Sequence, residues 1–367
     1  MSESSYKGDS PGKKVTRLRL WLNIRAMFRA LKTPYVGTLV LAGEGGDLSV
    51  LKAMGTDLTT VVAIDYDPFL IEWCSELYPN VLSLVGEAGE TSEVADYNIA
   101  HLDFCGGIRK AANIVTFAKV ARNMQTHPAL IALTIQKCRE GASALGPSRL
   151  LADVPRATQE RLFKQAQESG DQVGAHIFRG NRFDSRFVLS HSEARLRSML
   201  PINETTIKRG FYRPRGLGNL GHALIRADAM RWCAEWLLAA WGTPEPIVLR
   251  LIGTYTYHSE TKHDHGQPYL TALYAVVPKT AEQSVMAALD AVRIQRFDSW
   301  DKKASRSGLK PTALELAKHI PHIQVAQMLD IEHVRIEDWV VEGVGGTAPF
   351  SIEDLIQIPW SGFKFNG

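Results

Sequence analysis

The residues best suited to chemistry in this chain are a cluster of glycines and a carboxylate that follows the cluster after one helix and one strand. Thr38–Ala42 is a short apolar run rich in branched residues, as expected for a buried parallel strand. The glycine turn of residues 43–46 (GEGG) follows at once, and its missing Cβ atoms allow positive φ and a close backbone approach to a ligand. Asp65 comes about 20 residues later at the end of a second apolar run, where a carboxylate binds the ribose hydroxyls of a nucleoside cofactor.

The details of the glycine turn bear on which nucleoside cofactor fits. A dinucleotide-binding turn has the pattern G-x-G-x-x-G, which seats a pyrophosphate on the helix amino end. Here Leu48 stands at the third glycine position, and Glu44 and Asp47 crowd the turn. Negative charge repels a pyrophosphate but suits a cofactor with a cationic amino group and a sulfonium. The turn therefore favours S-adenosylmethionine, and an NAD(P)-dependent oxidoreductase is the less favoured alternative.

Two stretches, LVLAGEGGDL and VVAIDYDP, resemble the first and second motifs of the class I (Rossmann-like) S-adenosylmethionine-dependent methyltransferases. The resemblance covers residues 36–140 and 247–278. It implies that the glycine turn passes under the methionine moiety, that Asp65 holds the ribose and that Glu87 reads adenine. An ordinary strand-turn-helix, and a solvated acid at Glu87, remain the alternatives. The cofactor-binding candidates are Gly43, Glu44, Gly45, Gly46, Asp65, Tyr66 and Glu87.

The segment LDFCGG follows a fourth apolar run and occupies the place of the family's fourth motif, beside the reactive methyl group. The resemblance implies that Asp103 accepts a hydrogen bond from an exocyclic amine and that Phe104 stacks on a flipped base. Nucleic-acid methyltransferases that act on amines have the pattern [DNS]-P-P-[YFW] at this motif, and its two prolines are missing here. The segment is more similar to the D-x-D-P-F-G pattern of some tRNA guanine-N2 methyltransferases, again without the proline. The alternative is that Asp103 caps the next helix or binds the cofactor. Cys105 lacks the P-C pair of a C5-methylating nucleophile.

A basic segment follows the first five predicted strands. Arginines mixed with Phe211, Tyr212 and glycines suit phosphate neutralisation and base stacking, so the segment predicts a nucleic-acid partner, DNA or RNA. A solvated loop near the cofactor is the alternative. The candidate nucleic-acid contacts are Arg179, Arg182, Lys208, Arg209, Arg213 and Arg215. The histidines of HSETKHDHGQP lie on an expected hairpin tip without spaced partners, so no metal site is predicted.

The elements that must position these residues alternate between apolar runs and helical patterns. They predict an α/β fold with a doubly wound, mostly parallel, Rossmann-like sheet. Ile247–Tyr257 and Tyr269–Val277 predict the antiparallel closing hairpin with which sheets of the resembling family end. The expected organisation is a basic N-terminal tail and helix (1–35), a methyltransferase-like core (36–145 and 245–280), a mainly helical basic insert (146–244) and a helical C-terminal module (281–367).

Within that last module, Pro311–Gly343 has the spacing of a helix-turn-helix. Its third helix is expected to run through Val334, Ile336 and Trp339. Asp330 replaces the turn glycine, and the expected recognition helix is acidic, which favours a structural or dimerising module over a DNA contact.

Composition sets the outer bounds. The 367 residues carry a net charge of +3, and 45% of them are hydrophobic. No run approaches the apolar length of a membrane span, and the polar start lacks a signal peptide's core, which predicts a cytoplasmic protein with no membrane partner. The four cysteines have no CxxC spacing. A homodimer is left open, and the alternative to an enzyme is a catalytically silent adaptor that binds nucleic acid or protein.

Overall fold

The structure is a computed structural model that describes most of the chain up to residue 289 and three short pieces after it. It describes residues 11–43, 45–93, 96–104, 111–124, 128–136, 150–151, 153–179, 183–199, 202–203, 207, 212–213, 216–217, 219–243, 245–261, 264–289, 331–333, 339–341 and 363–365. Among these residues, no helix is long and apolar enough to cross a membrane.

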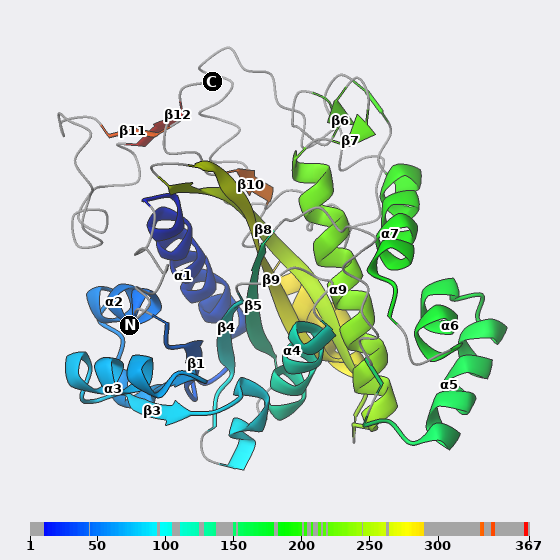
Figure 1. The fold of residues 1–367 in the computed structure, drawn as a ribbon, viewed down its shortest axis with the longest axis horizontal. Coiled ribbons are helices and arrows are strands. Elements are labelled where there is room, and N and C mark those ends of the chain that lie inside the picture. Colours follow the sequence, from blue (N-terminus) through cyan, green and yellow to red (C-terminus); the bar gives the residue numbers. More distant parts are fainter. Residues whose placement is uncertain are drawn as a thin grey trace.

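Helices and strands alternate through the first half of the chain, and in the described residues the helices α5, α6, α7 and α9 precede the last long strands (Figure 1). The helices are α1 (Pro11–Leu31), α2 (Gly46–Ala53), α3 (Pro68–Leu77), α4 (Ala111–Asn123), α5 (Arg156–Glu168), α6 (Gln172–Arg179), α7 (Ser185–Met199) and α9 (Asn219–Trp241). The strands of the main sheet are β1 (Thr38–Leu41), β2 (Val61–Asp65), β3 (Leu82–Val85), β4 (Ile99–Asp103), β5 (Ala129–Gln136), β8 (Ile247–Thr261), β9 (Asp264–Pro278) and β10 (Ile331–His333).

The main sheet has eight strands in the order β10-β8-β9-β5-β4-β1-β2-β3. The strands β3, β2, β1, β4 and β5 run parallel, and β9 is antiparallel to both β5 and β8. This order confirms the predicted Rossmann-like α/β fold and its antiparallel closing hairpin. The strands β1, β2 and β4 are almost wholly buried, as parallel strands covered on both faces must be.

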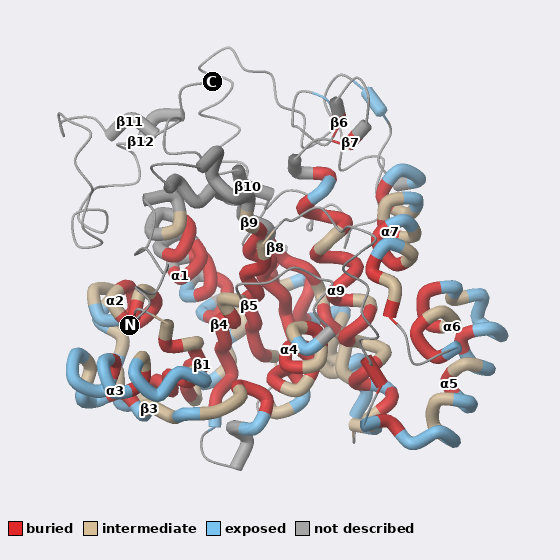
Figure 2. The backbone as a smooth tube through the Cα atoms, in the orientation of Figure 1, coloured by how far each residue is buried: buried red, intermediate tan, exposed pale blue. Residues whose placement is uncertain are grey.

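Helices cover both faces of the sheet. One face carries α1, α2 and α3, whose apolar side chains pack with Val40, Val61 and Ala63. The other face carries α4 and α9, which pack on the alternate residues of the same strands, such as Leu39 and Val62. Figure 2 shows this buried zone running through the middle of the molecule.

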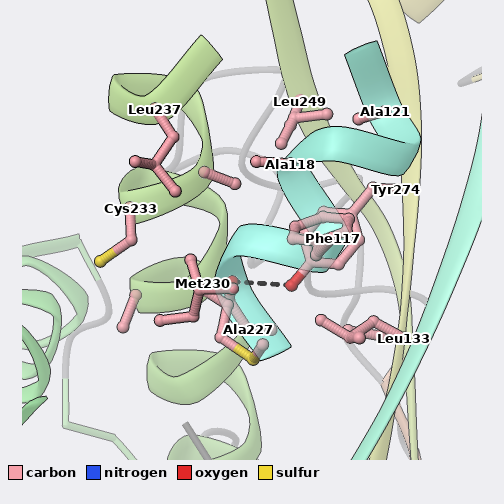
Figure 3. Packing of buried hydrophobic residues seen from close by; sticks show 14 of the residues in the cluster. Phe117, Ala118, Ala121, Leu133, Ala227, Met230, Cys233, Leu237, Leu249 and Tyr274 are labelled. Atoms are coloured by element: carbon pink, nitrogen blue, oxygen red, sulfur yellow. Dashed lines mark hydrogen bonds between the residues drawn. The ribbon is translucent and has the colours of Figure 1, made fainter. Parts of the chain in front are cut away.

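The insert is tied to the sheet by α9. Tyr274 of β9 is fully buried, and its hydroxyl donates a hydrogen bond to the carbonyl of Ala227 at 2.8 Å (Figure 3). Phe117 of α4 packs against the Tyr274 ring, with 5.1 Å between the ring centroids. The sheet, α4 and α9 therefore share one core.

Local sequence explains where the elements near the site begin and end. Asp67 accepts a hydrogen bond from the backbone N–H of Phe69 at 2.9 Å, and Pro68 opens α3, which is a favourable start for a helix. Gly55 has φ 72°, the left-handed conformation that commonly follows the end of a helix, here α2. In α1, Leu20, Trp21 and Ile24 are buried on the sheet.

The predicted helix-turn-helix of the C-terminal module falls mostly on residues that the structure does not describe. Most of Pro311–Gly343, including Val334 and Ile336, lies outside the described residues. Trp339, expected in a helix, lies in the strand β11 (Trp339–Val341), which pairs with β12 (Phe363–Phe365). The helix prediction is therefore wrong at Trp339, since the run Trp-Val-Val consists of aromatic and β-branched residues that favour extended backbone.

Candidate functional site

The glycine turn and Asp65 meet at the carboxyl ends of the neighbouring strands β1 and β2. The backbone N–H of Gly43 donates to Oδ2 of Asp65 at 3.1 Å, and the N–H of Asp67 donates to Oδ1 at 3.1 Å. Each carboxylate oxygen can accept a second hydrogen bond. Asp65 can therefore hold the turn in place and still accept hydroxyl donors from a ligand.

The glycines of the turn are required for two different reasons. Gly43 has φ 44°, and a Cβ placed on it would meet nothing within 4 Å, so its backbone borders open space. Gly45, the residue before α2, has φ 70°, and a Cβ there would lie 3.1 Å from Tyr78 and 3.3 Å from Trp73. The turn thus offers a bare backbone on its Gly43 side. Gly46 is the first residue of α2, and Glu44 lies outside the described residues.

The two remaining cofactor candidates follow β2 and β3 at the same edge of the sheet. The Tyr66 side chain is 71% exposed. Glu87 is half-buried, and Oε1 of its carboxylate accepts a hydrogen bond from the hydroxyl of Thr116 at 2.7 Å. The structure therefore places the described cofactor candidates on three adjacent strand ends, β1, β2 and β3.

Asp103, the catalytic candidate, ends β4 and is ion-paired with α1. Lys13 Nζ lies 2.9 Å and Arg17 Nη2 lies 2.8 Å from the same oxygen, Oδ2. Burial by itself raises the pKa of Asp103, but the charges of Lys13 and Arg17 outweigh it and hold the pKa well below its ordinary value. The carboxylate is therefore ionised at neutral pH and acts as a hydrogen-bond acceptor.

Asp47 behaves differently from what the sequence suggests. Its carboxylate does not border the glycine turn as free negative charge but is buried beneath α1. Oδ1 accepts hydrogen bonds from Trp21 Nε1 at 2.7 Å and contacts His101 Nδ1 at 2.9 Å, and Arg17 Nε lies 3.6 Å from Oδ2. Burial raises the pKa of Asp47, but His101 and Arg17 lower it further than burial raises it. Asp47 thus has its partners inside the protein, and the argument from an acidic turn rests on Glu44 alone.

A buried chain of hydrogen bonds continues from His101 into the sheet. His101 Nε2 lies 2.9 Å from the hydroxyl of Thr134, which lies 2.6 Å from the hydroxyl of Thr271. These groups come from β4, β5 and β9. Together with Lys13, Arg17 and Asp103 they line a cavity of about 10 Å³, which is about the space of one water molecule.

Phe104 is held by the core. It is half-buried and packs against the large hydrophobic cluster, and its backbone N–H donates to the carbonyl of Thr134 at 2.9 Å. Stacking on a base would use the exposed part of the ring. The structure therefore brings Asp103 and Phe104 to the predicted edge, with Phe104 also serving as a packing residue.

The basic candidates of the insert are only partly described. Arg179 ends α6 and is exposed. Arg213 lies in the short strand β6 (Tyr212–Arg213), which pairs with β7 (Gly216–Leu217). The residues Arg182, Lys208, Arg209 and Arg215 lie outside the described residues. Arg231, another arginine of the insert, is structural, since it is buried between Asp228 and Glu235.

Sequence reasoning missed Lys13 and Arg17, which α1 brings to the edge, and His101, which lies in β4 itself. His101 carried a usable signal, because it is a histidine among the apolar residues of the run IAHL. Lys13 and Arg17 carried none that points to Asp103, which lies 86 residues from Arg17 in the chain.

Comparison with known proteins gives structural neighbours only. No model of a protein family matches the chain, and no curated protein matches it. Among solved structures, it is similar to a putative RNA methyltransferase from Pyrococcus horikoshii (10% identity, TM-score 0.32, 70% of this chain and 84% of that chain). It is also similar to the magnesium protoporphyrin IX methyltransferase from Synechocystis (9%, 0.32, 72% and 83%) and to a TehB-like SAM-dependent methyltransferase from Corynebacterium glutamicum (15%, 0.23, 36% and 77%). The fold assignment rests on the strand order and register described above.

Proposed function

We propose that this chain is an S-adenosylmethionine-dependent methyltransferase whose acceptor is an exocyclic amine of a nucleic-acid base, in DNA or RNA. The observation that carries the proposal is the hydrogen bond between the Gly43 N–H and the Asp65 carboxylate at adjacent strand ends. In an open α/β sheet, ligands bind outside the carboxyl ends of the strands, and a carboxylate at the end of the second strand suits a ribose.

The residues present fit such a cofactor. The bare backbone at Gly43 allows close approach, and Asp65 has acceptor capacity for two ribose hydroxyls. Tyr66 and Glu87 would border the adenine. When bound, the cofactor supplies a methyl group that is already activated by its sulfonium. The task left to the protein is to bring an acceptor into line with that methyl group.

Asp103 is assigned to the acceptor amine. Because Lys13 and Arg17 both contact Oδ2, the other oxygen, Oδ1, is the one that would accept an N–H hydrogen bond from the target. The two cations keep the carboxylate ionised, so it can orient the amine lone pair and stabilise positive charge that develops on the nitrogen. Phe104 would then border the base.

The same ion pairs favour a second candidate, a methyltransferase fold that binds nucleic acid or protein without catalysis. With two cations on Asp103, its charge is already balanced from within the protein. In this alternative, Asp103 anchors α1 to the sheet and has no role toward an acceptor. The missing prolines of the fourth motif support this alternative.

A methyl-transfer assay separates the two functions. The full chain would be incubated with S-adenosylmethionine carrying a tritiated methyl group and with pools of DNA or RNA. The enzyme proposal expects label in one nucleic-acid pool and a loss of at least about 100-fold in Asp103→Asn, which keeps the shape of the side chain but lowers its acceptor charge. Binding of S-adenosylhomocysteine by the variant serves as the control for folding.

The outcomes are distinct. Cofactor binding by the native chain without transfer to either pool supports the adaptor. Full transfer by Asp103→Asn shows that Asp103 is only an anchor for α1. If the tritiated methyl group enters neither DNA nor RNA but is transferred to protein, the acceptor is not a nucleic-acid base.

A further inference from the structure

Exposed apolar side chains concentrate on one end of the sheet, on α3 and the strand end of β2 and on β3. Six of the nine exposed large hydrophobic residues found in the described part of the chain lie there. Five of them form what we call the α3–β3 patch: Tyr66, Phe69, Trp73, Leu77 and Val85. The sixth, Leu82, pairs with Val62 and lies on the sheet face opposite to α3. Phe69 is 77% exposed and Val85 59%, and large apolar side chains gathered on neighbouring elements mark an interaction site.

The helix α3 presents its part of the patch as a regular stripe. Phe69, Trp73 and Leu77 recur every four residues, so they lie on one face of the helix. Ile71 and Cys74 are buried on the opposite side. The exposed acids Glu72 and Glu76 fall one residue before Trp73 and Leu77, beside the apolar stripe. The face offered to solvent is thus apolar along its centre and negative along one border.

The charge of this region is one-sided over a long stretch. Residues 53–108 contain no lysine or arginine, so all 42 of them lie elsewhere in the chain. The acids of the same stretch are Asp57, Asp65, Asp67, Glu72, Glu76, Glu87, Glu90, Glu93, Asp96 and Asp103. Among the described cations from other elements, Lys119 pairs with Glu90 at 2.6 Å and Lys52 lies over the Tyr78 ring.

The position of the patch separates it from the rest of the surface. β3 is the last strand at its end of the main sheet in the part of the chain that the structure describes. The helices α5, α6 and α7 of the insert lie at the far side of the molecule (Figure 1), and α3 and β3 are largely exposed (Figure 2). The patch therefore faces solvent away from the basic insert.

Charge decides which occupant fits. A nucleic acid would bring phosphates against the acids of this face, which is repulsive. A second copy placed by a two-fold axis would bring the same α3 face, whose stretch of sequence holds acids and neither lysine nor arginine. A helix with an apolar stripe flanked by lysines or arginines complements both the stripe and its acidic border. We propose that the α3–β3 patch is the docking site for a basic amphipathic helix of a partner protein.

Calorimetric titration of the full chain with synthetic helical peptides tests this. The probe is an 18-residue amphipathic peptide of leucine and lysine. Two comparison peptides have glutamate in place of lysine, or the same composition in scrambled order. We expect only the first to bind, with an affinity that falls as salt is raised. The double variant Glu72→Lys with Glu76→Lys, and separately Phe69→Ala, should each weaken binding by about tenfold or more.

The matched control makes the same charge change on another exposed helix. Glu160→Lys with Glu168→Lys on α5 should bind the basic peptide as the native chain does, and unfolding midpoints should match across the variants. Equal weakening by this control, or equal binding of the scrambled peptide, would overturn the proposal, because attraction would then be a matter of net charge alone. So would sedimentation showing a dimer that Phe69→Ala dissociates, or nucleic-acid binding that Phe69→Ala abolishes.

Discussion

At the scale of single residues, the site is defined by carboxylates that have opposite surroundings. In the part of the chain that the structure describes, Asp65 accepts hydrogen bonds from backbone N–H groups at the strand ends, whereas Asp103 and Asp47 are held by the side chains of Lys13, Arg17 and His101. The first arrangement leaves acceptor capacity toward solvent. The second satisfies the charges inside the protein and fixes α1 on the sheet.

The acid sensitivity of the fold should follow from Asp47 and Asp103. Both have folded-state pKa values below the ordinary value of 3.8, so the unfolded chain takes up their protons first as pH falls. Their contribution to stability is therefore complete above about pH 5 and is lost progressively as pH falls through 4 and below. Urea unfolding at pH 6, 4 and 3 should show this loss.

A matched variant isolates the contribution of Asp103. Asp103→Asn removes its titration, so the free energy of unfolding should be lower at pH 6 but should depend less on pH between 5 and 3. An unchanged pH dependence in this variant would show that the ion pairs with α1 do not contribute to stability.

At the scale of elements, much could be predicted because the signals are local. Leu48 and Leu51 share one face of α2, which ends before Gly55, and Asp67-Pro68 opens α3, so the local sequence explains both helices. The contacts of Asp47 and His101 could not be predicted, because their partners come from α1 and from β5, far away in the chain. The helix predicted at Trp339 was wrong, because a few residues of helical spacing do not outweigh the preference of its β-branched neighbours for a strand.

The packing of the insert helices makes a prediction in which two effects oppose each other. Gly174 lies in α6, where alanine would normally add about 0.5–1 kcal/mol of helix stability. A Cβ there, however, would lie 2.5 Å from the Trp236 ring. Overpacking costs about 1–3 kcal/mol, so Gly174→Ala should lower the free energy of unfolding.

Chemical denaturation of four chains checks this balance. The set is the native chain, Gly174→Ala, Trp236→Phe and the double variant. Because phenylalanine is smaller, Gly174→Ala should cost less in the Trp236→Phe background. An equal cost in both backgrounds would mean that α6 does not pack on α9 as described.

At the scale of the whole molecule, the α/β class and the mostly parallel sheet could be predicted from apolar runs and their spacing, and the closing hairpin from the family resemblance, but the order of the strands within the sheet could not. The pairing of β10 with β8 could not, since Ile331–His333 is too short to carry a pattern of its own. Three features are combined in the chain. The strand ends carry a bare backbone at Gly43, α1 is ion-paired to the sheet, and the surface of α3 and β3 is apolar with an acidic border. Cofactor and acceptor are proposed at the strand ends and the partner at α3 and β3, with Tyr66 at the border between them.

The central claim is that the strand ends around Gly43 and Asp65 bind S-adenosylmethionine, and calorimetry with S-adenosylhomocysteine tests it most directly. We predict binding in the micromolar range by the native chain, weaker binding by Asp65→Asn and none detectable by Asp65→Ala. Asp96→Ala, which removes an exposed acid just before β4, should bind as the native chain does. The absence of binding by the native chain, or equal affinity in Asp65→Ala, would contradict the account.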